Sequence, residues 1–159
     1  MNRREFVKSA ALASAVTSLP MNAIEAATGT PAGHPAVEAS VVRLNLRHTW
    51  TTHMSSSQYR ETLHVKLTRD GITGIGEGAP IVRYDEDAVH GKEAVESIRD
   101  LLTSASPEHY EKVMQEVRKR FHGNYAAQAA IDIALMDWFG KKHGLPLYRH
   151  YGLDAADAP

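Results

Sequence analysis

Hydrophobic and polar residues alternate along the chain from residue 37 to residue 68, a pattern typical of β-strands with one buried face. The first alternating run starts near Val37, and its clearer apolar face is Val42, Leu44 and Leu46. The second run covers residues 59–68, and its inward face is Leu63, Val65 and Leu67. The polar segment 49–57 between the two runs is expected to be a loop that carries Trp50 and Met54.

A tight hairpin turn is predicted at Asp70-Gly71, because both residues tolerate the positive φ angles that such turns need. A third strand follows from Ile72, and every second position in it is a glycine: Gly74, Gly76 and Gly78. Glycine weakens a strand, so its repetition on one face indicates the close approach of another element. Three consecutive strands of this kind predict an antiparallel meander.

Beyond Pro80 the apolar residues recur at helical spacing. An acidic run at residues 85–87 predicts the start of a first helix, since the helix dipole favours negative charge there. Its apolar stripe is Ala88, Val95, Ile98, Leu101 and Leu102. Ser106 and Pro107 predict the start of a second helix, and Asn124 and Gly144 bound a third, largely buried one. Strands followed by a bundle of three helices indicate an α+β fold.

Composition limits the chemistry available to the 159 residues. Eighteen basic and 19 acidic residues give a net charge of -1, which argues against a nucleic-acid partner bound through bulk charge. Cysteine is absent, which excludes disulfides and thiolate nucleophiles, and the nine histidines lack metal-site spacing. The length is also short of the roughly 250 residues of a (β/α)8 barrel.

Residues 1–26 resemble a twin-arginine export signal, with Arg3, Arg4, Phe6 and Lys8 in the expected order. The mild apolar run that follows is shorter than the about 20 residues needed to cross a bilayer. We therefore expect cleavage after Ala26, a periplasmic location and no stable membrane insertion. Residues 27–36 then form a linker. The alternative is an amphipathic N-terminal helix that packs on the protein.

Two segments carry a family resemblance: Gly74 to Pro80 and Ala129 to Arg149. They resemble the N-terminal capping domain of the enolase superfamily, in the mandelate racemase/muconate lactonizing enzyme branch. Arg83-Tyr84 and the segment 48–51 look most like dipeptide epimerases. The resemblance covers residues 37–154, and residues 155–159 would begin the link to a C-terminal TIM barrel that this chain lacks.

The resemblance implies an isomerase that moves a proton next to a carboxylate, with the intermediate stabilised by Mg²⁺. The bases and metal ligands would lie on the missing barrel, so this chain alone is expected to be inactive and to contain no catalytic or metal-binding residue. The implied partners are a short peptide substrate such as a cell-wall dipeptide, the protein's own barrel and, as in other family members, further copies of the chain.

In such enzymes two loops of the capping domain close over the barrel and set substrate specificity. The matching segments here are 50–57 and 80–84, and the candidate substrate-binding residues are Trp50, His53, Met54, Ser55, Ile81 and Tyr84. Dipeptide epimerases often place an arginine in the first loop. Its absence from residues 51–57 favours less acidic dipeptides over L-Ala-D/L-Glu.

Two alternatives remain open from the sequence. The chain is either the cap of another superfamily enzyme, such as an acid-sugar dehydratase or a cycloisomerase, or a stand-alone, non-catalytic binding domain. A cap without its barrel is expected to leave the glycine-rich strand and the tail near Tyr148 uncovered. Asp132, Asp137 and Glu77 are interpreted as structural hydrogen-bonding groups rather than as catalytic or metal-binding ones.

Overall fold

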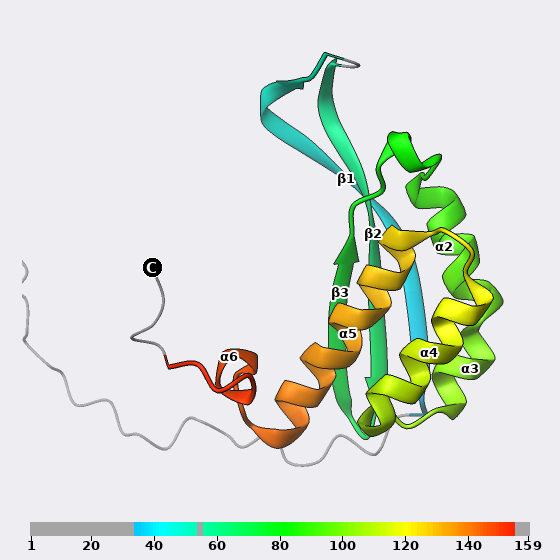
Figure 1. The fold of residues 1–159 in the computed structure, drawn as a ribbon, viewed down its shortest axis with the longest axis vertical. Helices are drawn as coiled ribbons and strands as arrows, with labels where there is room; N and C mark the ends of the chain where they lie inside the picture. The colour runs from blue at the N-terminus through cyan, green and yellow to red at the C-terminus, as the bar shows by residue number, and fades with distance from the viewer. Residues whose placement is uncertain (1–33, 54–55, 155–159) are drawn as a thin grey trace, which may run out of the picture.

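The computed structural model describes residues 34–53 and 56–154, and the predicted export signal lies outside them. Three antiparallel strands form one sheet in the order β1-β2-β3, and the helices follow in sequence (Figure 1). The α+β prediction is therefore confirmed. The elements are β1 (Ala36–Thr51), β2 (Ser56–Arg69), β3 (Ile72–Gly78), η1 (Val82–Tyr84), α2 (Ala88–Ser97), α3 (Arg99–Ser104), η2 (Pro107–His109), α4 (Tyr110–Arg120), α5 (Tyr125–His143) and α6 (Leu147–His150).

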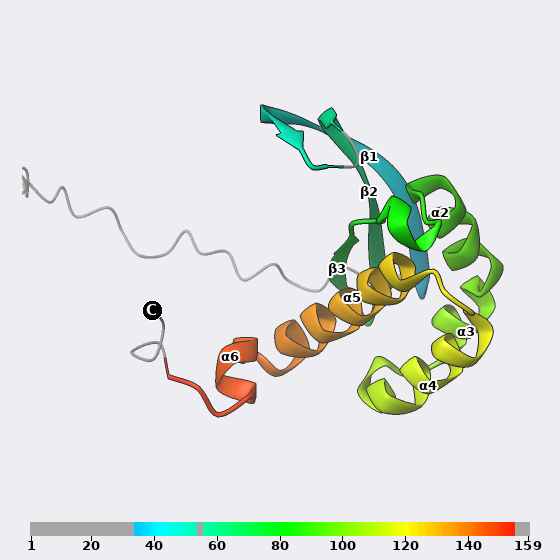
Figure 2. The same ribbon diagram turned by 45° about the horizontal axis from the view of Figure 1, so that its top comes forward.

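The helices α2 to α5 cover one face of the sheet, and α6 projects beyond the edge formed by β3 (Figure 2). The core lies between this face and the helices, where Leu63, Val65 and Leu67 of β2 meet Trp138 of α5. The predicted inward face of the second strand is thus confirmed. No helix in the described ranges is long and apolar enough to cross a membrane.

The turn between β2 and β3 is the predicted one. Asp70 and Gly71 have φ angles of 54° and 73°, and they alone join the two strands. Positive φ at both positions belongs to the type I′ turn, whose twist matches that of the flanking strands.

The buried face of β1 is the opposite of the predicted one. Val37 is buried, and Ala39 packs against the core, whereas Leu44 is 40% exposed. The reason lies in the pairing, because Val37 and Ala39 stand opposite Leu67 and Val65 on the helix side of the sheet. Val42 and Leu44 of the predicted face lie on the side of the sheet away from the helices, so their apolar character misled the prediction.

The loop predicted over residues 49–57 is much shorter. Trp50 and Thr51 belong to β1 and pair with Ser57 and Ser56 of β2. The two strands continue past the helices as a long hairpin, which stands clear of the rest of the domain in Figure 1. Trp50 is therefore a strand residue near the end of this hairpin rather than a loop residue.

The glycine-rich face of β3 lies directly against α5. A methyl group on any of these glycines would stand 1.9 to 2.0 Å from a carbonyl oxygen of α5, in the pairs Gly74–Ala134, Gly76–Ala130 and Gly78–Ala126. The close approach predicted from the glycines is thus confirmed. The expectation that this strand would be uncovered is wrong for its glycine face, which α5 covers, whereas Ile75 on the other face is 49% exposed. Tyr148 and Tyr151 of the tail are exposed, as expected.

The helices differ from the prediction at their ends. The first predicted helix is split at Ile98 into α2 and α3. Ser106 precedes a 3-10 turn with Pro107 in its first position, but the Ser106 side chain makes no capping bond. Asn124 also occupies a cap position without a side-chain cap, whereas Gly144 ends α5 with φ 61°, as predicted.

Candidate functional site

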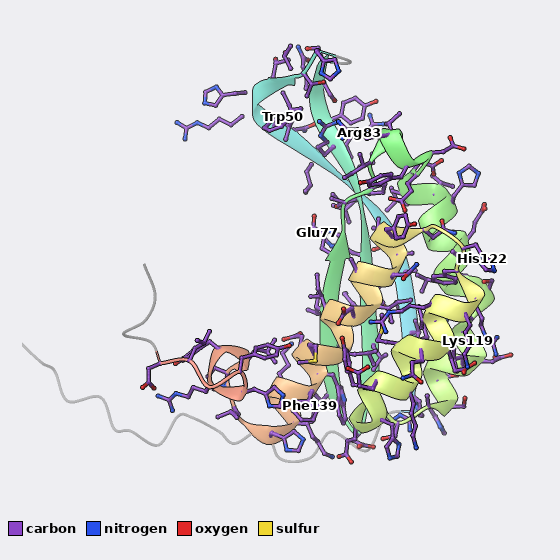
Figure 3. The ribbon with its side chains drawn as sticks, viewed as in Figure 1. Trp50, Glu77, Arg83, Lys119, His122 and Phe139 are labelled. Atoms are coloured by element: carbon purple, nitrogen blue, oxygen red, sulfur yellow. The ribbon has the colours of Figure 1, made fainter. Side chains whose placement is uncertain are left out.

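The predicted substrate-binding residues that the structure describes gather at one end of the domain. Trp50 lies near the end of the β1–β2 hairpin, His53 follows it, and Ile81 and Tyr84 belong to the segment around η1. Figure 3 shows Trp50 and Arg83, the residue before Tyr84, at this same end. Met54 and Ser55 lie outside the described residues.

These side chains are largely open to solvent. Trp50 is 57% exposed, Ile81 51% and Tyr84 56%. Each is a large apolar side chain open to contact with another molecule or domain, and Trp50 and Ile81 lie 31 residues apart in the sequence. The structure therefore brings the two predicted segments to one end of the domain, as the prediction requires.

The segment around η1 is held to the start of α5. The ring of Tyr84 makes an edge-to-face contact with Tyr125, with ring centres 5.6 Å apart. The amide of Tyr84 donates to the carbonyl of Ile81 at 2.9 Å, and Glu86 accepts a hydrogen bond from the amide of Tyr125. These contacts fix the backbone that carries Ile81 while leaving its side chain exposed.

An open depression of about 530 Å³ lies beside η1, and the sequence analysis did not identify it. Its lining residues are Val82, Asp85, Glu86, Asp87, His90 and Asn124. The Asp87 carboxylate is already engaged, since it accepts from the amides of Val89 and His90 at 2.8 Å each and caps α2. The His90 amide is the main cause that lowers the pKa of Asp87, and the ring bond to Asp87 raises the pKa of His90.

Two of the three acidic residues interpreted as structural make hydrogen bonds that hold elements together. Asp132 accepts from the Tyr110 hydroxyl at 2.8 Å, and Asp137 accepts from the amide of Ile75 at 2.8 Å. Glu77 lies 3.9 Å from Nε2 of His64, which is too far for a hydrogen bond, so the structural bond expected of Glu77 is not supported. Within residues 34–53 and 56–154 no three histidine or acidic side chains come together as a metal site. The residues described here therefore do not fit a Mg²⁺ ligand set.

One cluster on the hairpin was missed by the sequence analysis. Arg43 lies over the ring of Tyr59 and donates to Glu61, all on the solvent-exposed part of the hairpin. Its signal in the sequence is weak, because Arg43 and Glu61 are 18 residues apart and only the strand register places them opposite each other.

Comparison with known proteins gives one consistent set of relatives. A model of the mandelate racemase/muconate lactonizing enzyme N-terminal domain matches residues 36–152. An L-Ala-D/L-amino acid epimerase of Pedosphaera parvula is 36% identical over 114 residues, covering 69% of this chain and 32% of its own length. A hydrophobic dipeptide epimerase of Enterococcus faecalis is 30% identical over 118 residues, covering 73% of this chain and 33% of its own length.

Solved structures agree with these sequences. A crystal structure of a dipeptide epimerase from Enterococcus faecalis, complexed with Mg and the dipeptide L-Leu-L-Tyr, superimposes with a TM-score of 0.68 at 29% identity. The match covers 72% of this chain and 33% of that one. The chain thus spans about a third of the length of the relatives that it matches.

Proposed function

The chain belongs to the family of mandelate racemase/muconate lactonizing enzyme N-terminal domains, and from this membership we propose that it is the specificity cap of a dipeptide epimerase. Relatives at 36% and 30% identity carry epimerase names, which supports this reaction over others of the superfamily. The complete enzyme would move the proton next to a carboxylate, with the chemistry on a barrel domain and the choice of peptide made by the cap.

The observation that carries the proposal is the exposed pair of segments at one end of the domain. Trp50 on the hairpin and Ile81 beside η1 present apolar surface there, and η1 is fixed by the Tyr84–Tyr125 contact. A rigid sheet that holds two such segments is suited to enclose the outer part of a bound substrate and exclude water from it.

A less acidic dipeptide is the proposed substrate. The described part of the 51–57 segment contains no arginine that would pair with a side-chain carboxylate, and the exposed side chains of Trp50 and Ile81 beside it are apolar. We propose that Mg²⁺ is bound by the barrel domain, where it would stabilise the negative charge of the intermediate. In the described part of the cap, Asp132 and Asp137 are engaged in structural hydrogen bonds, and no three histidine or acidic side chains come together to hold that ion.

Export by the twin-arginine pathway is a further part of the proposal. It rests on Arg3, Arg4, Phe6 and Lys8 and on the mild apolar run that follows them. Changing both arginines to lysine is expected to keep a fused reporter in the cytoplasm, whereas changing Lys8 to arginine is expected to leave export intact. Equal export of the reporter with both arginines replaced would refute this part.

The test of the function uses the polypeptide encoded by the whole open reading frame. It is incubated in D₂O with Mg²⁺ and a panel of apolar, acidic and basic dipeptides, and α-proton exchange is followed by NMR. We expect exchange with apolar dipeptides and much slower exchange with L-Ala-L-Glu. The 159-residue chain alone serves as the control and is expected to be inactive.

Other outcomes favour the alternatives. Turnover of sugar acids or of muconate, with no exchange in any dipeptide, would assign the cap to another enzyme of the superfamily. A reading frame that encodes no barrel, together with defined ligand binding by a monomeric chain, would favour a stand-alone binding domain.

A further inference from the structure

The β1–β2 hairpin extends beyond the part of the sheet that the helices cover. We call its residues 43–53 and 56–61 the arm. Beyond Thr62, which is buried, the β2 residues from Glu61 to Tyr59 are exposed, and so are Arg43 to Asn45 of β1. The arm therefore has no apolar layer packed against it, and contacts between its own two strands must hold its shape.

Three side chains at the base of the arm make such contacts. The Arg43 guanidinium donates from Nη2 and Nε to Oε1 of Glu61, at 2.7 and 3.1 Å. Its central carbon lies 4.2 Å from the ring centre of Tyr59, a cation–π distance. We call Arg43, Tyr59 and Glu61 the brace. An isolated exposed ion pair adds little, but this arginine combines two hydrogen bonds with a ring contact.

The brace lies where the regular pairing of the arm stops. Strand pairing is continuous up to Asn45 opposite Tyr59, and the next pair is Trp50 opposite Ser57. Four residues of β1, 46–49, thus stand against the single residue Gln58 of β2. An irregularity of this kind bends a strand and redirects the side chains that follow. Tyr59 belongs both to the brace and to the last regular pair.

We propose that the brace sets the direction of the arm's end, so that Arg43, Tyr59 and Glu61 are positioning residues for Trp50. This proposal rests on the proposed function. In the complete enzyme, the brace would affect how tightly the dipeptide substrate is bound. The brace contacts no substrate, and it fixes the segment through which Trp50 would meet the outer part of the peptide. Loss of the brace lets the arm sample other directions, which weakens substrate binding without changing the reacting groups.

The first test needs no activity. Amide hydrogen exchange of the full chain is measured by mass spectrometry for Arg43→Gln. We expect peptides from residues 44–59 to exchange about fivefold faster or more, with those from β3 and α5 unchanged. The control is Lys119→Gln, which removes the same charge and an exposed ion pair of 2.6 Å with Glu116 on α4. It should leave the arm unchanged.

The second test is kinetic and uses the complete enzyme with a dipeptide that it epimerises. Arg43→Gln should raise KM about threefold to tenfold and leave kcat within about twofold. The exchanged pair Arg43→Glu with Glu61→Arg should restore most of the affinity, which a general loss of folding would not allow. Lys119→Gln should match the wild type in both constants.

The outcomes separate the two proposals. If no dipeptide is turned over by the wild type, the proposed function fails, and hydrogen exchange alone decides whether the brace orders the arm. Unchanged exchange in the arm of Arg43→Gln overturns the brace. A KM equal to that of the wild type, or a loss confined to kcat, overturns its role in positioning Trp50.

Discussion

The carbonyl oxygen of Ala130 lies 1.9 Å from the position that a Cβ atom would take on Gly76. The backbone of α5 therefore rests on the backbone of β3 with no side chain between them. The same contact is made one helical turn away on either side, at Gly74 and Gly78. This packing holds the long helix against the sheet and so sets the position of the Tyr125 end of α5, against which Tyr84 packs.

Gly76→Ala is expected to destabilise the domain by at least about 2 kcal/mol, since the added methyl group meets fixed backbone atoms and forces β3 and α5 apart. Urea unfolding followed by circular dichroism measures the effect. Gly91→Ala is the matched control, because its methyl group would meet side chains rather than the backbone of another element, Cδ2 of Leu63 at 3.3 Å and Cβ of Ala127 at 4.0 Å. That variant should be neutral or gain up to about 1 kcal/mol from helix propensity. Equal losses in both variants would contradict the packing argument.

Asp137 closes part of the free edge of β3. Its carboxylate accepts from the amide of Ile75 at 2.8 Å and from the amine of Lys141 at 2.7 Å. Asp137→Ala should cost about 1 to 2 kcal/mol in unfolding free energy, because it leaves a strand amide without its acceptor. Asp137→Asn keeps an acceptor oxygen and should lose less. A loss as large in the asparagine variant would show that charge, rather than the bond to Ile75, matters.

The two tryptophans of the chain should contribute very differently to the free energy of unfolding. Trp138 is 1% exposed and donates to the carbonyl of Arg69 at 3.0 Å, so Trp138→Phe should cost roughly 2 to 3 kcal/mol. Trp50 is exposed, so Trp50→Ala should change stability by less than about 0.5 kcal/mol. In the complete enzyme Trp50→Ala should nevertheless raise KM for the preferred dipeptide. An unchanged KM would remove Trp50 from the proposed binding surface.

Stability should fall in alkali because of Tyr110. Burial, followed by the hydrogen bond to Asp132, raises the pKa of Tyr110 from 10.0 to about 12. The unfolded chain then loses this proton at lower pH than the folded one, so the contribution is complete below pH 10 and is lost as the pH rises towards about 12.

Urea unfolding of the wild type and of Tyr110→Phe at a series of pH values measures that contribution. The difference between the two proteins should shrink as the pH rises through this window. Asp132→Asn removes the neighbouring charge and should weaken the pH dependence without abolishing it, since burial remains. A difference that stays constant with pH would refute the assignment.

Local signals predicted most of the fold. Asp70-Gly71 predicted its turn because only residues that tolerate positive φ suit it, and the alternate glycines of β3 predicted the contact with α5. The prediction of the buried face of β1 failed at Leu44, since both faces of that strand carry apolar residues and periodicity alone does not choose between them. The choice depends on the register with β2, a contact between distant residues.

The candidate site was predicted in part. Trp50, Ile81 and Tyr84 were identified through a family resemblance, and the structure places them at one end of the domain. The brace could not be predicted, because Arg43 and Glu61 look like ordinary surface charges until the strands are paired. The depression beside η1 was missed for the same reason, since its walls come from segments on both sides of the α2–α4 region.

The sequence by itself determined the order of strands and helices, the β2–β3 turn and the family, because each depends on residues close together in the chain or on a preserved motif. Only the tertiary structure decided which face of β1 is buried, where the arm extends beyond the helices and which side chains form the brace. Those features depend on strand register and on the reach of the helices, which arise from the packing of residues far apart in the sequence.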